Sequence, residues 1–215
     1  HRVERLRDTD GDGVADVTEV AGTSWHQPET EADKTFIHRR VDDAIGLAMD
    51  AQGRLYTSLG TPNHANAWQR DKDSAGRYYG DVARYRRERY RGSIIRLNGD
   101  GKPEQIATGV RFAVALGFNR HGDLFATDQE GYTWGPGNPY DELLHIEPGR
   151  HYGFPPMHPK FLPDVVDAPS VVDFGPMHQS TCGFCFNETR EGFKRFGPAD
   201  WEDDAIVTGE SRGKL

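Results

Sequence analysis

The sequence has few cysteines, little excess positive charge and no long apolar run. Its 215 residues include only two cysteines, which argues against a disulfide-dense scaffold or a four-cysteine zinc site. No apolar stretch approaches the roughly 20 residues that a transmembrane helix needs, so we expect no membrane span. The formal net charge is −8, and the arginine-rich residues 84–91 have acidic neighbours. We therefore expect no nucleic-acid binding.

Glycine and proline, by contrast, are plentiful, with 25 and 13 copies, and this usage favours an all-β, turn-rich fold. Residues 42–60 and 111–129 are two copies of one pattern: a short apolar strand, a turn that ends in glycine, and a second strand that begins with leucine and an aromatic residue. This pattern predicts a repeated hairpin. Because one hairpin cannot bury its apolar face alone, we expect the copies to stack as in a β-propeller or solenoid.

The spacing of further hairpins predicts the sheets of a propeller. Residues 93–108 form a second hairpin that would complete the first copy, and residues 141–146 supply a third strand after the second copy. Residues 181–186 and 205–209 would begin another sheet, and residues 61–92 form a long insertion. We therefore interpret residues 1–215 as one partial β-propeller domain of about three to four blades.

Residues 8–19 match the twelve-residue calcium-binding loop at every ligand position. Calcium prefers six to eight oxygen ligands, and a glycine at position six allows the sharp turn around the ion. The predicted ligands are Asp8, Asp10, Asp12, the Val14 carbonyl, Asp16 and Glu19. The flanking residues favour strands, so we expect a structural calcium loop that caps a hairpin. An exposed acidic turn without an ion is the alternative.

The residue before each innermost strand of a propeller faces the central channel. This rule brings together Asp42 or Asp43, Arg111 and His178 as candidate catalytic residues. An acid or imidazole would accept a proton from an alcohol, and arginine would steady an anionic cofactor or a developing alkoxide. The same three residues equally suit sugar binding or a buried salt-bridge network.

A second group of polar residues follows the repeated hairpin, and its oxygens could bind a second calcium ion or simply line an acidic surface loop. These residues are Gln129, Glu130, Asp141 and Glu142. The only cysteine pair is Cys182 and Cys185, for which we expect buried thiols or a local disulfide rather than a redox role.

Residues 42–155 resemble the soluble sugar dehydrogenases that depend on pyrroloquinoline quinone, including sorbosone-dehydrogenase-like propellers found beside cytochrome c domains. The matching features are an arginine that opens the hairpin, Gln129 after it, the Asp141-Glu142 pair and the turn at residues 149–155. The sequence departs from the family pattern at Asp42, where a catalytic histidine is expected, and at Phe112, where an asparagine is expected.

The resemblance implies a six-bladed propeller with a calcium-bound quinone on its axis, and it assigns cofactor contacts to Arg111, Gln129, Asp141 and Glu142. It implies oxidation of a sugar or alcohol, with electrons passed to an external acceptor such as a cytochrome c domain, in the periplasm or outside the cell. Two alternatives remain open: a non-catalytic propeller that binds carbohydrate or protein, and a calcium-dependent, lactonase-like hydrolase.

Overall fold

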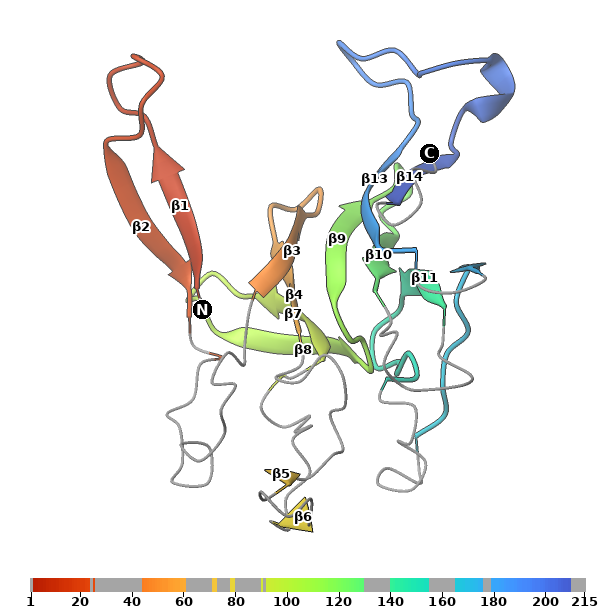
Figure 1. Ribbon diagram of the computed structural model, residues 1–215. Coiled ribbons are helices and arrows are strands. Elements are labelled where there is room, and N and C mark those ends of the chain that lie inside the picture. Colours follow the sequence, from red (N-terminus) through yellow and green to blue (C-terminus); the bar gives the residue numbers. More distant parts are fainter. Residues whose placement is uncertain are drawn as a thin grey trace.

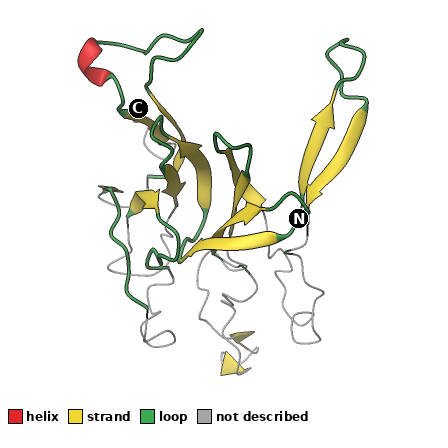
Figure 2. Cartoon of the chain, turned by 180° about the vertical axis from the view of Figure 1, so that it is seen from behind, coloured by secondary structure: helices red, strands yellow, loops and turns green. Residues whose placement is uncertain are grey.

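The structure is a computed structural model that describes residues 2–23, 25, 44–60, 71–72, 78–79, 90, 92–129, 140–154, 165–175 and 179–209. These residues form short antiparallel strands, which confirms the all-β fold class. The only helical element among them is the 3-10 turn η2 (Ala199–Trp201), in the long loop that precedes the last strand (Figure 2). In this described part, no helix has the length and apolar character needed to cross a bilayer.

Two four-stranded antiparallel sheets form the centre of the structure, and in each the strands lie in sequence order (Figure 1). We call the first sheet blade A; its strands are β3 (Ala44–Met49), β4 (Leu55–Leu59), β7 (Ser93–Leu97) and β8 (Pro103–Thr108). We call the second blade B; its strands are β9 (Ala113–Phe118), β10 (Leu124–Asp128), β11 (Asp141–Ile146) and β12 (Val172–Phe174). Blade A has the four strands predicted from the repeated hairpins, whereas blade B has the three predicted strands and also β12, which lies where only a connection was expected.

The turns of these sheets repeat one hydrogen-bond pattern, at residues 50–54, 98–102 and 119–123. In each, the N–H of the first residue donates to the carbonyl of the fifth, and the N–H of the fourth donates to the carbonyl of the first, at 2.8–3.1 Å. The fourth residue is always a glycine with φ between +76° and +87°, a region that other residues avoid. Glycine recurs at the fourth position of each turn because that position requires a positive φ.

The sheets stack with their first strands side by side. Strand β3 packs beside β9, and β9 packs beside β13 (Thr181–Phe186). Side-chain hydroxyls tie the sheets together: Ser58 Oγ donates to the Ala113 carbonyl, and Thr127 Oγ1 donates to the Cys182 carbonyl, each at 2.6 Å. These contacts place three successive sheets around one inner row of strands.

Apolar cores fill the spaces between neighbouring sheets. Blade A shows this most clearly, because Ile94 and Ile95 are consecutive in β7 and both fully buried. Consecutive strand residues point to opposite faces, and Ile94 joins the core shared with blade B while Ile95 joins a second core with Val3 and Trp25. Both faces of blade A are therefore covered.

The two ends of the stack are two-stranded sheets. At one end, β1 (Val3–Arg7) pairs with β2 (Val17–Gly22) and packs against blade A. At the other, β13 pairs with β14 (Ala205–Gly209) beside blade B. Within the long insertion, β5 (Asp71–Lys72) pairs with β6 (Tyr78–Tyr79).

Candidate functional site

Several of the predicted polar residues lie at the end of the stack where the inner strands begin. Arg111 lies two residues before β9, Gln129 follows β10, and Asp141 and Glu142 open β11. We call this the site end; β5 and β6 lie on the same side of the stack (Figure 1). The glycine turns at residues 50–54, 98–102 and 119–123 lie at the opposite end, which we call the turn end.

A fully buried carboxylate, Asp128, organises the loop at Arg111. Its Oδ2 accepts from the Arg111 N–H at 2.8 Å, and its Oδ1 accepts from the Phe112 N–H at 2.7 Å. Burial raises the pKa of Asp128 to about 6, although these two backbone donors act to lower it. The guanidinium of Arg111 donates to the Gln129 carbonyl at 2.6 Å. The loop before β9 is therefore fixed from both sides.

Two of the predicted cofactor residues tie blade B to the next sheet. The side-chain amide of Gln129 donates to the Thr181 carbonyl at 2.9 Å. The Asp141 carboxylate is buried, and its Oδ2 accepts from the Gln179 N–H at 3.1 Å and from the Thr181 N–H at 3.0 Å. Both side chains thus bind the backbone that leads into β13.

Glu142 belongs to a row of carboxylates. The antiparallel register places it opposite Asp128 of β10 on one side and Asp173 of β12 on the other, so the three side chains share one face of the sheet. Glu142 is half-buried, and burial, followed by the charge of Asp128, raises its pKa to about 8. It therefore holds a proton at neutral pH and can donate a hydrogen bond.

The acidic loop between β1 and β2 is built by hydrogen bonds from its own backbone. Asp8 Oδ1 accepts from the Gly11 N–H at 2.6 Å, and its Oδ2 accepts from the Gly13 N–H at 2.9 Å. Asp12 Oδ1 accepts from the Val14 N–H at 2.7 Å. The bonds from Gly13 and then Gly11 lower the pKa of Asp8, so this carboxylate is ionised at neutral pH.

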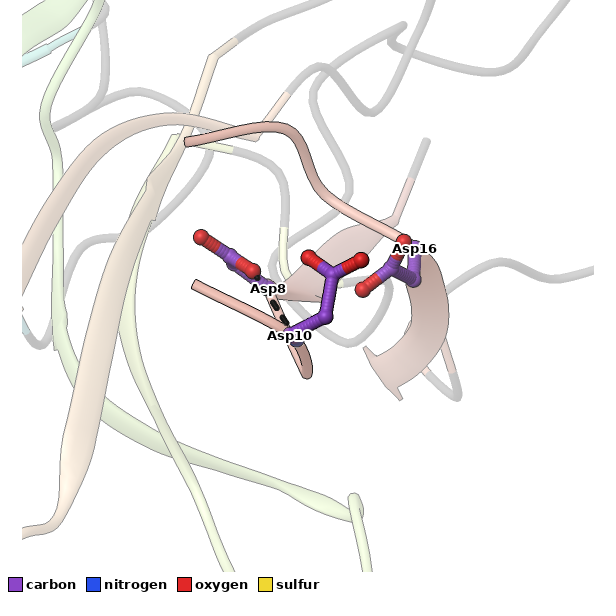
Figure 3. Close-up of side chains that lie close together, drawn as sticks. All are labelled: Asp8, Asp10 and Asp16. Atoms are coloured by element: carbon purple, nitrogen blue, oxygen red, sulfur yellow. Dashed lines mark hydrogen bonds between the residues drawn. The ribbon is translucent and has the colours of Figure 1, made fainter. Parts of the chain in front are cut away.

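Asp8, Asp10 and Asp16 converge in this loop (Figure 3). Each offers a carboxylate oxygen, and these oxygens lie within 4.8 Å of one another. Among the His, Cys, Asp and Glu side chains that the structure describes, no other group of three comes as close. Thr9 orients Asp16: its hydroxyl and its N–H donate to Asp16 Oδ2 at 2.7 and 2.8 Å, which lowers the pKa of Asp16.

The other predicted ligands of this loop are placed differently. Glu19 lies in β2, where its carboxylate forms ion pairs with Arg5 at 3.6 Å and Arg7 at 3.8 Å. Asp12 is exposed in the turn, and its carboxylate accepts the Val14 N–H. The loop itself lies on the side of the stack opposite β5 and β6 (Figure 1).

Comparisons with known proteins found no matching family model and no matching curated protein. Among solved structures, a glucose dehydrogenase superposes on 95% of this chain with a TM-score of 0.55 and 17% identity, and the match covers 55% of that protein. A second glucose dehydrogenase structure gives a TM-score of 0.53 with 17% identity over 95% of this chain and 56% of the other. The chain thus spans about half the length of the structures it matches.

A shorter match, over 53% of this chain and 30% of the other, is to the PQQ-bound aldose sugar dehydrogenase of Streptomyces coelicolor, with 23% identity and a TM-score of 0.35.

The chain has the fold of a sugar-dehydrogenase β-propeller. Its stacked antiparallel sheets and adjacent inner strands confirm the fold that the repeated hairpins predicted. Blades A and B are complete blades of this propeller, and the two terminal sheets are partial ones.

The structure describes only some of the polar residues predicted for the axial site and the cofactor. Asp42, Asp43, His178 and Glu130 lie outside the described residues. Arg111 lies at the site end, where its guanidinium donates to the Gln129 carbonyl. Asp141 and Glu142 are consecutive in β11 and point to opposite faces of blade B.

Of the four predicted cofactor residues, only Arg111 has the chemistry to bind an anionic quinone. A quinone with several carboxylates needs cations and hydrogen-bond donors, and Arg111 is the predicted residue with that chemistry. The side chains of Gln129 and Asp141 are bonded to the backbone of the next sheet. Glu142 lies among the carboxylates of Asp128, Asp141, Asp167 and Asp173, which disfavour a further anion.

Sequence reasoning missed Asp128, although the repeat contained a signal. In the first hairpin copy the equivalent position is Leu59, a fully buried residue at the end of β4. A carboxylate in place of a core leucine must find hydrogen-bond partners in the interior, and here it finds the N–H groups before β9. A charged residue at an apolar position of the repeat was the available clue.

The prediction of buried thiols or a local disulfide was wrong for both cysteines, because Cys182 is only partly buried. Cys182 and Cys185 are both free thiols, and Cys185 is exposed. The Sγ of Cys182 donates to the Ser180 carbonyl at 3.2 Å. Strand β13 borders only blade B in the described part of the chain, so one of its faces stays open and exposes Cys185.

Proposed function

We propose that this propeller takes part in the oxidation of a sugar or another alcohol and passes the electrons to an external acceptor. The observation that carries the proposal is the superposition of 95% of the chain on a glucose dehydrogenase. A second point of support is the fixed position of Arg111 before an inner strand, at the end where neighbouring blades present their loops.

Oxidation of an alcohol removes a proton from oxygen and a hydride equivalent from carbon. In this proposal a pyrroloquinoline quinone supplies the two-electron acceptor, and Arg111 holds one of its carboxylates. Asp128 keeps the Arg111 loop in place through two backbone bonds at 2.7–2.8 Å. Glu142, protonated at neutral pH, is suited to donate a hydrogen bond to a sugar oxygen. The proton acceptor is assigned to Asp42 or His178.

We further propose that the loop of residues 8–16 binds calcium as a structural ion. Its donors are hard oxygens from Asp8, Asp10 and Asp16, which calcium prefers. A structural calcium ion suits a periplasmic or extracellular protein, where we place this propeller. There its electrons would pass to a cytochrome c domain or another redox partner.

A non-catalytic propeller that binds carbohydrate is the second candidate. It is favoured by the use of Gln129 and Asp141 as ties between blades rather than as cofactor ligands. A lactonase-like hydrolase needs its calcium on the axis, whereas the converging aspartates lie at the turn end (Figure 1).

Binding of the quinone tests the first candidate. The chain would be titrated with pyrroloquinoline quinone and calcium by equilibrium dialysis, followed by dye reduction with a panel of sugars. Arg111→Met should weaken quinone binding at least tenfold, whereas Arg150→Met, which changes an exposed arginine in the turn after β11, should not. Sugar binding without quinone binding or dye reduction would favour the non-catalytic propeller.

A further inference from the structure

The strand register shows which residue of the β13 segment corresponds to Arg111. Strands β9 and β13 begin with Ala113 and Thr181, and each of these residues forms the first pair of its inner hairpin. Arg111 lies two residues before Ala113, and Gln179 lies two residues before Thr181. Gln179, and not His178, is therefore the counterpart of Arg111 in the next sheet.

A buried carboxylate holds the backbone at both of these positions. Asp128 accepts the Arg111 N–H at 2.8 Å, and Asp141 accepts the Gln179 N–H at 3.1 Å. Both carboxylates are fully buried. Burying a carboxylate is costly unless hydrogen bonds compensate it, and here the compensating bonds come from the segments that lead into the inner strands. Gln179 is thus fixed in the same manner as Arg111.

Ser180, the residue after Gln179, has a strained backbone. Its φ is +52°, a region that residues other than glycine seldom adopt. Asp141 Oδ2 holds the chain on both sides of it, because it accepts the N–H groups of Gln179 and Thr181 at 3.1 and 3.0 Å. Strain of this kind is concentrated at binding and catalytic sites, where the surrounding structure maintains it. The strain therefore points to a binding role for the segment of residues 179–181.

Gln129 connects this segment to Arg111. Its main-chain carbonyl accepts from the Arg111 guanidinium at 2.6 Å, and its side-chain amide donates to the Thr181 carbonyl at 2.9 Å. Strands β9 and β13 pack side by side, so Arg111 and Gln179 lead into neighbouring inner strands at the site end. Gln179 is 8% exposed. A hydrogen bond between its side chain and a ligand would therefore form away from bulk water, where a missing partner costs most.

We propose that the side-chain amide of Gln179 binds a hydroxyl group of the sugar substrate and so determines which sugars the site accepts. This inference rests on the proposed function, because it takes the ligand to be a sugar. A carboxamide offers two N–H donors and an acceptor oxygen, whereas the guanidinium of Arg111 offers donors alone. Gln179 can therefore accept a hydrogen bond from a sugar hydroxyl, which Arg111 cannot do. A site built to bind a hydroxyl strongly rejects the analogue that lacks it.

Monodeoxy sugars test this contact. Calorimetric titration would compare glucose with each of its monodeoxy analogues on the wild type and on Gln179→Met, which keeps the side-chain length but lacks the amide. The wild type should bind one analogue at least about tenfold more weakly than glucose, and Gln179→Met should bind that analogue and glucose equally weakly. The variant should keep the wild-type penalties for the other analogues. If no penalty disappears selectively, Gln179 does not bind a sugar hydroxyl.

Two further variants separate this role from a structural one. Gln179→Glu keeps the length and an acceptor oxygen, so it should keep the penalty that Gln179→Met loses. Gln52→Met, which changes an exposed glutamine in the turn at residues 50–54, should bind all the sugars as the wild type does. Urea unfolding should show that Gln179→Met remains folded, because methionine retains the N–H that Asp141 accepts.

Dye reduction distinguishes a failure of this inference from a failure of the proposed oxidation. If the wild type binds no quinone and reduces no dye, the oxidation proposal fails, and the sugar titrations still decide the role of Gln179. If dye is reduced, Gln179→Met should raise the KM for glucose at least about tenfold, with kcat within a few-fold of wild type and quinone binding unchanged. A wild type that binds no sugar, or a Gln179→Met variant with wild-type affinity for glucose, would overturn the inference.

Discussion

The imidazole of His151 occupies the space that a side chain on Gly109 would need. A Cβ at Gly109 would lie 1.9 Å from Nδ1 of His151 and 2.6 Å from the Tyr152 nitrogen. This close approach lets residues 149–154 run beside β8: the Tyr152 N–H donates to the Thr108 carbonyl and the Phe154 N–H to the Gly109 carbonyl, both at 2.9 Å. Blade A thereby gains an additional strand-like segment from the connection between β11 and β12 of blade B.

Replacing Gly109 with alanine should destabilise the propeller more than the same change in an open turn. Gly109→Ala suffers both a clash and a positive φ of +78°, whereas Gly53→Ala at φ +77° has no atom within 4 Å of the new methyl. The positive φ costs about 1–2 kcal/mol in each variant, and the clash should add about 1–3 kcal/mol for Gly109 alone. Urea unfolding of both variants measures the difference; equal losses would show that His151 moves freely.

The Asp141 carboxylate should be needed for the attachment of β13. Asp141→Ala leaves the N–H groups of Gln179 and Thr181 without their acceptor in a buried place, so we expect a loss of about 2–5 kcal/mol in the free energy of unfolding. Asp200→Ala, at an exposed position in η2, should change stability by less than about 0.5 kcal/mol. If both variants unfold at the same urea concentration, Asp141 does not join the sheets.

The fold could be predicted from sequence because it repeats, whereas the roles of the polar residues could not. Apolar alternation and turn glycines recur in each hairpin, so local patterns agree with the global architecture. The Asp141 carboxylate binds the backbone of the next sheet, and this contact depends on how neighbouring blades pack against each other. The local sequence pattern carries no information on that packing. Glu142, the next residue, shows the same limit: burial and then the charge of Asp128 raise its pKa, and only the register of β10, β11 and β12 places these carboxylates next to one another.

The stability of the propeller should fall as pH rises through the titration of Glu142. The native state holds this proton up to a pKa of about 8, while the unfolded chain releases it near the ordinary value of 4.5. The unfolded state is therefore favoured as pH rises between these values. At about 1.4 kcal/mol per pH unit, the wild type should lose about 2 kcal/mol between pH 6.5 and 8.

Glu142→Gln removes this titration, so its stability should be nearly constant over the same range. The control is Glu147→Gln, an exposed glutamate in the turn after β11, which should keep the wild-type pH dependence. Because Asp128 titrates with a pKa of about 6, measurements above that pH separate the two carboxyls. A wild-type stability curve that is flat from pH 6.5 to 8 would contradict a protonated Glu142.

Calcium should bind through Asp16 rather than through Glu19, although the twelve-residue pattern includes both. Asp16 converges with Asp8 and Asp10, whereas Glu19 is paired with arginines of β1. Asp16→Asn and Glu19→Gln each remove one negative charge from the same hairpin, so long-range electrostatic effects on the ion should be similar. Calorimetric titration should therefore show calcium affinity reduced at least tenfold in Asp16→Asn and within a few-fold of wild type in Glu19→Gln. The reverse order would mean that Glu19 leaves its arginine partners to complete the calcium shell, as the sequence pattern alone had predicted.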